Sequence, residues 1–146
     1  IGEKAFDRCS SLTSITIPNS VTYIGETAFA VCSSLTSITI PNSVMDIEFG
    51  TFAECSSLTS VTLGNNVTSI GDSAFYKCSS LTSITIPESV TSIGDSAFYE
   101  CSSLNSITYE GTTEQWKDIT IVDNSFSNCN TITVKCSDED IIIENN

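Results

Sequence analysis

The seven cysteines are the residues of this chain whose chemistry most needs an explanation. Thiols at suitable spacing can bind zinc, form disulfides or act as nucleophiles. The interval here is 23 residues, which fits no Cys-x-x-Cys zinc pattern, and the chain contains no histidine. Five cysteines open near-identical segments at that interval: Cys9, Cys32, Cys55, Cys78 and Cys101.

A repeated position favours a structural thiol, because a buried free cysteine behaves as a small apolar residue. Cys129 returns to the same position of the repeat after a five-residue insertion. Stacked copies would hold their Cβ atoms about 4.8 Å apart, whereas a disulfide requires roughly 3.8 Å. We therefore expect a ladder of free thiols. Cys129 and Cys136 lie seven residues apart at an irregular end, and a bridge between them stays an open alternative.

Carboxylates also recur in one column of the repeat and could bind calcium or cap turns. Calcium takes six to eight oxygen ligands, which one carboxylate per repeat does not supply. An acid at the start of a turn meets unpaired amides and the positive end of the turn dipole. We expect these residues to cap short helical turns and expect no metal site: Glu3, Glu26, Asp72, Asp95 and Asp118.

The remaining chemistry argues against catalysis and against several classes of partner. The serines are repeated positions without a distinguished copy, and no glycine-rich phosphate loop accompanies the lysines, so we expect neither an enzyme nor a cofactor. With 18 acidic and 5 basic residues the net charge is −13, which disfavours nucleic acid and anionic membrane surfaces. No apolar run is long enough to insert into a membrane.

The elements that position these residues follow from the apolar pattern of one repeat. Leu81 is followed by Ile84 and Ile86, separated by a polar residue, and alternation of β-branched residues indicates a strand. Pro87 ends that strand because proline lacks the amide donor. A second apolar pair lies on the return path, and Gly-Asp-x-Ala-Phe, ending at Phe98, closes the repeat.

Near-identical units with a period in the twenties predict a solenoid, in which each unit covers its neighbour's apolar side. We expect a repeat β-solenoid with a parallel sheet, a second face of short strands and short helical turns. The predicted array is one domain, residues 1–136, followed by an acidic tail, 137–146. Its parts are a partial coil 1–8, coils 9–31, 32–54, 55–77 and 78–100, a variant capping coil 101–128 and a terminal strand 129–136.

The run Leu-Thr-Ser-Ile-Thr-Ile-Pro-x-Ser-Val-Thr-x-Ile-Gly-x-x-Ala-Phe-x-x-Cys resembles the BspA-like subclass of leucine-rich repeats over nearly the whole chain. Tyr109 to Trp116 resembles the Tyr-x-Gly-Thr-x-x-x-Trp variant that ends arrays in this family. The resemblance implies a right-handed superhelix at the cell surface or in the extracellular space, used for adhesion and protein binding. Its partner would be a protein or glycan on a host or neighbouring cell. Glu48, Phe49, Thr51 and Gly64 depart from the motif.

Function should lie on the outward positions of the main sheet, where hydroxyl side chains form two uncharged columns. Such columns could serve only to keep a sheet hydrated, or could dock a protein or glycan. Two alternatives remain: spacer repeats of a longer surface protein, and ice binding through the hydroxyl ladders. The candidate binding face consists of Ser14, Thr16, Ser37, Thr39, Ser60, Thr62, Ser83, Thr85, Ser106 and Thr108.

Aromatic residues and the two chain ends complete the predictions. Tyr23, Tyr76 and Tyr99 lie outside the apolar columns and are candidate anchors for a partner. Trp116 is expected to cap the last isoleucine column. Residues 1–8 begin within a repeat, which suggests a fragment of a longer array or end-to-end self-association through the uncapped first coil. The acidic tail, with Ile141 to Ile143 in its middle, suggests a last strand or a linker.

Overall fold

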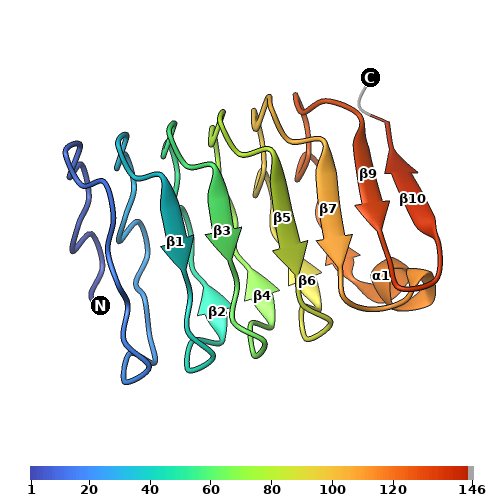
Figure 1. The fold of residues 1–146 in the computed structure, drawn as a ribbon, viewed down its shortest axis with the longest axis horizontal. Coiled ribbons are helices and arrows are strands. Elements are labelled where there is room, and N and C mark those ends of the chain that lie inside the picture. The colour runs from blue at the N-terminus through green and yellow to red at the C-terminus, as the bar shows by residue number, and fades with distance from the viewer. Residues whose placement is uncertain (145–146) are drawn as a thin grey trace.

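Each repeat turns once around the long axis of the molecule, so that equivalent residues of successive repeats lie side by side (Figure 1). The structure is a computed structural model and describes residues 1–144. Its larger sheet has the order β1-β3-β5-β7-β9-β10. The strands are β1 (Ser37–Thr39), β3 (Ser60–Thr62), β5 (Ser83–Ile86), β7 (Ser106–Tyr109), β9 (Ile132–Lys135) and β10 (Asp140–Ile143).

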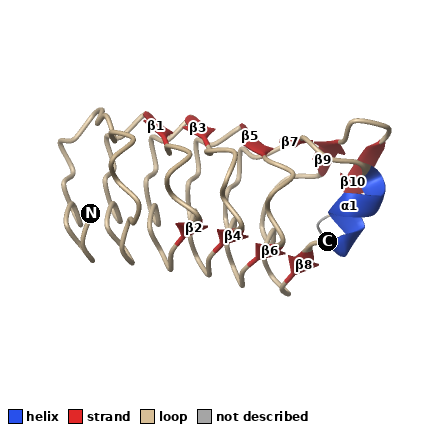
Figure 2. Cartoon of the chain, turned by 90° about the horizontal axis from the view of Figure 1, so that it is seen from below, coloured by secondary structure: helices blue, strands red, loops and turns tan. Residues whose placement is uncertain are grey.

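A second, narrower sheet lies across the core from the first (Figure 2). Its strands are two residues long and pair in parallel in the order β2-β4-β6-β8. They are β2 (Asp46–Ile47), β4 (Ser69–Ile70), β6 (Ser92–Ile93) and β8 (Thr120–Ile121). In both sheets the register follows the repeat, as in the pairing of Ser69 with Ser92 and of Ile84 with Ile107. The predicted β-solenoid with a parallel sheet and a short-strand face is confirmed.

The core between the two sheets consists of columns of identical side chains. Leu35, Leu58, Leu81 and Leu104 are fully buried, and the inward isoleucines of the strands from β1 to β7 are at most 3% exposed. Ile121 in β8 is only partly buried. Six phenylalanine rings form a continuous stack with centroids 5.1 to 5.5 Å apart. Each ring therefore covers the ring of the adjacent coil. The stack is built from contacts between neighbouring coils. The stacked residues are Phe6, Phe29, Phe52, Phe75, Phe98 and Phe126.

The segment that closes each repeat differs from the prediction, because it forms successive tight turns instead of a helical turn. Ser73 and Lys77 have φ angles of 55° and 57°, in the left-handed region, which interrupts any helical run. The amides of Ala74 and Tyr76 donate to carbonyls three residues earlier. The expectation that Asp72 and Asp95 cap a helical turn is therefore wrong. The Asp72 carboxylate instead accepts a hydrogen bond of 2.9 Å from the amide of Asp95 in the next coil.

The cysteine column is buried from Cys32 to Cys101, whereas Cys9 at its start is exposed and Cys129 is half-buried. All seven cysteines of the described chain are free thiols. The Sγ of Cys55 donates to the carbonyl oxygen of Phe29 at 3.1 Å, and Cys78 donates likewise to Phe52 at 3.2 Å. Burial raises the pKa of Cys55 to about 12 and that of Cys32 to about 11. The column therefore provides neutral, hydrogen-bonded side chains that join neighbouring coils.

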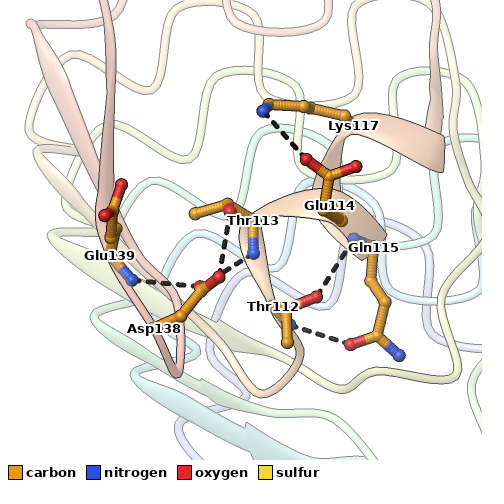
Figure 3. A network of polar contacts seen from close by, with 7 residues as sticks. All are labelled: Thr112, Thr113, Glu114, Gln115, Lys117, Asp138 and Glu139. Carbon is orange, nitrogen blue, oxygen red and sulfur yellow. Dashed lines mark hydrogen bonds and ion pairs between the residues drawn. The ribbon is translucent and has the colours of Figure 1, made fainter.

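The C-terminal end of the stack is closed by α1 (Thr113–Asp118) and by β10. Thr112 and Gln115 form a reciprocal capping box at the start of α1, and the Asp138 carboxylate accepts from the amide and hydroxyl of Thr113 (Figure 3). Trp116 is 5% exposed and contacts Tyr109 edge-on at 5.3 Å. Trp116 therefore lies in the core at this end of the stack, and its predicted role as a cap over the last isoleucine column stays a prediction.

The two ends of the array show how far the regular pattern extends. Residues 14–16 form no regular strand, although Thr36 donates its amide to the carbonyl of Thr13 in the coil before. Within the predicted acidic tail, residues 140–143 form β10, which pairs antiparallel with β9. Residues 145–146, the end of that tail, lie outside the described residues. The predicted coil boundaries stay predictions.

Candidate functional site

The structure places eight of the ten candidate hydroxyl residues on the outer face of the six-stranded sheet. They occupy β1, β3, β5 and β7, where outward hydroxyl residues alternate with buried apolar ones. All are exposed except Ser106, which is half-buried. Ser14 and Thr16 are exposed in the coil before β1, without regular strand pairing. The column of outward hydroxyl residues is thus continuous over four strands, and Ser14 and Thr16 lie beside these strands, in the coil before β1.

This outer face is chemically uniform until its C-terminal edge. Ser37 lies opposite Ser60, and Ser83 opposite Ser106, so that hydroxyls follow one another along each column. The threonine column ends at β9, where the residue paired with Thr108 is Lys135. A repeated Ser-x-Thr pattern offers many equal hydrogen-bonding sites and little to distinguish one position from another. It suits broad contact with a partner better than recognition of one short sequence.

The three candidate tyrosines do not form one cluster. Tyr76 and Tyr99 stack on each other with centroids 5.5 Å apart and an interplanar angle of 9°. Tyr23 is equivalent in the repeat to Asp46 of β2 and therefore lies on the side of the second sheet. Its side chain is 52% exposed. The structure thus gives an aromatic pair at one corner of the solenoid and a separate exposed ring on the second-sheet side.

A feature that the sequence analysis missed lies next to the aromatic pair. An open groove of about 480 Å³ runs along the stack, just before the strands of the larger sheet. Two columns line it, the residues immediately before and immediately after each cysteine. The lining residues are Val31, Ser33, Glu54, Ser56, Lys77, Ser79, Glu100, Ser102 and Asn128.

The middle of this groove carries alternating charges. Glu54, Lys77 and Glu100 occupy the same position in three successive coils. The ammonium of Lys77 lies 3.7 Å from the carboxylate of Glu100 and 5.1 Å from the centroid of the Tyr76 ring. Contact with the Tyr76 side chain and the charge of Glu100 raise the pKa of Lys77. Lys77 therefore stays protonated and links the aromatic pair to the groove.

The signal that could have revealed the groove is variation between repeats. Most positions of the unit hardly change from coil to coil, because each must stack on its own copy. The position before the cysteine changes in almost every coil, through arginine, valine, glutamate, lysine, glutamate and asparagine. A search for apolar periodicity ignores such a column, since its residues contribute nothing to the core. The residues are Arg8, Val31, Glu54, Lys77, Glu100 and Asn128.

The described residues contain no group of three or more His, Cys, Asp or Glu side chains placed to hold a metal ion. Asp72, from the predicted acidic column, accepts a hydrogen bond from the amide of Asp95 in the next coil. In residues 1–144 no helix is both long and apolar enough to cross a membrane.

Comparison with known proteins identifies the architecture. The sequence matches the BspA type leucine rich repeat region, in six copies, over residues 1–133. No curated protein matches the sequence. Among solved structures, a leucine-rich repeat protein from Bacteroides ovatus is similar, with 32% identity and a TM-score of 0.79 over 93% of this chain and 34% of that one.

Two further structures support the same assignment. A leucine-rich repeat protein of T. pallidum has 28% identity and a TM-score of 0.72, covering 93% of this chain and 65% of that one. A leucine rich cell surface protein from Faecalibacterium prausnitzii has 33% identity and a TM-score of 0.65, covering 71% and 34%. The chain spans less than two thirds of the length of each of these three proteins. With its repeats matched and its solenoid shared, the chain belongs to the BspA-type leucine-rich repeat family.

Proposed function

We propose that this chain is a non-catalytic adhesion module of a cell-surface or secreted protein, and that it binds a protein or glycan on a host or neighbouring cell. Leucine-rich repeat proteins are interaction modules, and one similar structure is described as a cell surface protein. The observation that carries the proposal is the exposed hydroxyl face of β1, β3, β5 and β7. Broad, uncovered solenoid surfaces of this kind serve as docking faces.

The second side of the solenoid makes a less suitable contact surface, because several of its polar side chains already bond between coils. Asp46 accepts from Ser69 at 2.7 Å and from Thr68 at 3.1 Å. On the larger-sheet side, Thr36 and Thr59, which directly precede β1 and β3, donate to carbonyls of the preceding coil. Among the described residues, the serines and threonines within β1, β3, β5 and β7 form no inter-coil bond through their side chains. Their hydroxyls are free to bond with a partner.

Binding to intact cells tests the proposal. The fluorescently labelled chain should bind saturably to epithelial or bacterial cells, as followed by flow cytometry. Thr62→Lys together with Thr85→Lys places two bulky cations on the face and should weaken binding about 10-fold or more, the scale of losing one central contact. Thr22→Lys with Thr91→Lys makes the same chemical change at exposed threonines on the second-sheet side and should leave binding intact.

The result that overturns the proposal is an absence of saturable binding, or equal loss in the two double variants. Treating the cells with trypsin or with glycosidases before the assay distinguishes a protein partner from a glycan partner.

The alternatives predict different results. A spacer role predicts that the parent protein still adheres after deletion of one 23-residue coil, whereas a docking face predicts weaker adhesion. Ice binding predicts a measurable thermal hysteresis. We expect none, because Lys135 interrupts the threonine column at β9. End-to-end self-association through the first coil stays a prediction, and sedimentation at increasing protein concentration tests it.

A further inference from the structure

We propose that the groove beside the cysteine column binds an extended peptide carrying two basic side chains three residues apart, with an acid between them. The inference rests on the proposed interaction function and names a second, selective site within it. The groove has a volume of about 480 Å³, carries alternating charges and lies beside an aromatic pair. None of these features occurs on the uniform hydroxyl face of the larger sheet.

Variation between coils is the first reason to assign selectivity to the groove. A surface that repeats one residue in every coil offers a partner the same contact at each step. The groove presents Val31, Glu54, Lys77, Glu100 and Asn128 in succession, and therefore gives each step a different chemistry. A ligand lying along the stack would meet these groups in a fixed order, which is the requirement for recognising a sequence.

The order of charges indicates the chemistry of the ligand. Glu54 forms no ion pair among the described residues, and Glu100 is paired with Lys77 across 3.7 Å. A cation placed at Glu54 and a second at Glu100 would complement the two carboxylates. An acid between them would take over Lys77 as its partner. A neutral oligosaccharide has no charged group to complement this alternation, so the groove favours a peptide.

Spacing makes the motif specific. Glu54 and Glu100 are two coils apart, which is about 10 Å at the spacing of paired strands. In a polyproline II peptide, residues i and i+3 lie on the same side and are about 9 Å apart. Aromatic side chains beside a groove also suit such a peptide, which loses little entropy on binding. The expected motif is therefore basic-x-acidic-basic or basic-acidic-x-basic in an extended conformation, with the acid turned about 120° from the two basic side chains, toward one side of the groove.

A labelled peptide tests this inference on the full chain. Fluorescein-labelled Pro-Arg-Pro-Glu-Arg-Pro should bind in a fluorescence anisotropy titration, and its affinity should fall with added salt. Glu54→Gln and Glu100→Gln should each weaken binding about 2- to 5-fold, the range for one exposed ion pair. Glu88→Gln, an exposed carboxylate after the end of β5, should have no effect. Far-UV circular dichroism verifies that each variant is folded.

Two control peptides and one competitor define failure. The charge-reversed Pro-Glu-Pro-Arg-Glu-Pro and the misspaced Pro-Arg-Arg-Pro-Glu-Pro should bind more weakly. The proposal is overturned if either binds equally well, if no binding occurs at about 1 mM peptide, or if the groove variants behave like Glu88→Gln. Displacement of the peptide by a neutral hexasaccharide would assign the groove to a glycan instead.

Failure here is distinguishable from failure of the adhesion proposal. A chain carrying Glu54→Gln and Glu100→Gln that still binds cells, while no peptide binds the parent chain, overturns the groove and leaves the hydroxyl face standing. Peptide binding without any cell binding supports the groove and overturns the adhesion proposal.

Discussion

Replacement of Phe75 by alanine tests whether the phenylalanine stack holds the solenoid together. Phe75 is 0% exposed, and its ring lies 5.5 Å from that of Phe52 and 5.3 Å from that of Phe98. Phe→Ala in a well-packed core costs about 3 to 5 kcal/mol through lost burial and the cavity that remains. That is roughly two to four powers of ten in the folding equilibrium, and a third or more of the stability of a domain near 10 kcal/mol.

Urea unfolding followed by circular dichroism measures the effect, and Phe49→Ala supplies a matched control. Phe49 is 50% exposed, so the same substitution should change the free energy of unfolding by no more than about 0.5 kcal/mol. Each coil contacts only its neighbours, so the gap at Phe75 should also separate the stack into two halves and lower the denaturant slope. A loss below about 1 kcal/mol, or equal losses in the two variants, would refute the stacked core.

Three further predictions concern the thiols, the tight turns and the C-terminal cap. The pKa of Cys55 is raised from an ordinary 9.0 to about 12, so above pH 9 the unfolded chain ionises first. Stability should then fall between pH 9 and 12 by up to about 1.4 kcal/mol per pH unit for this thiol, as measured by urea titrations across that range. Gly71→Ala would place a Cβ 2.7 Å from the Ile47 carbonyl oxygen and should cost about 1 to 3 kcal/mol in thermal unfolding, whereas Gly2→Ala, with open space around it, should be neutral. Thr112→Ala removes the cap of α1 and should cost about 0.5 to 2 kcal/mol, and an unchanged midpoint would contradict the capping geometry.

The architecture could be predicted from the sequence because the contacts that hold one coil to the next recur in every regular repeat. The alternation of Ile84 and Ile86, with Leu81 before and Pro87 after, defines a strand, and the period of the copies defines the stack. The turns could not be predicted, because left-handed positions are usually marked by glycine. In the described chain eleven of the twelve residues with positive φ are other amino acids, so the interruption of a helix at Ser73 was not visible.

The candidate site was only partly predictable for a related reason. Alternation along a strand places Thr62 and Thr85 on the outer face without any knowledge of the turns. The groove depends on where two successive turns direct Glu54, Lys77 and Glu100, and those positions carry no apolar pattern. The stacking of Tyr76 on Tyr99 follows from their shared column, but the separation of Tyr23 from that pair requires the path of the second sheet.

The reversal of direction between β9 and β10 limits how such a protein can change in length during evolution. A further repeat would add its strand in parallel to the edge of the sheet. Because β10 runs antiparallel to β9, it does not offer a parallel edge to such a strand. Duplicated units can therefore enter at any junction before β9, where both flanks are parallel, and leave the closing segment untouched. The acidic residues around β10 add electrostatic repulsion at that border and discourage fusion of one ladder with another into a fibre.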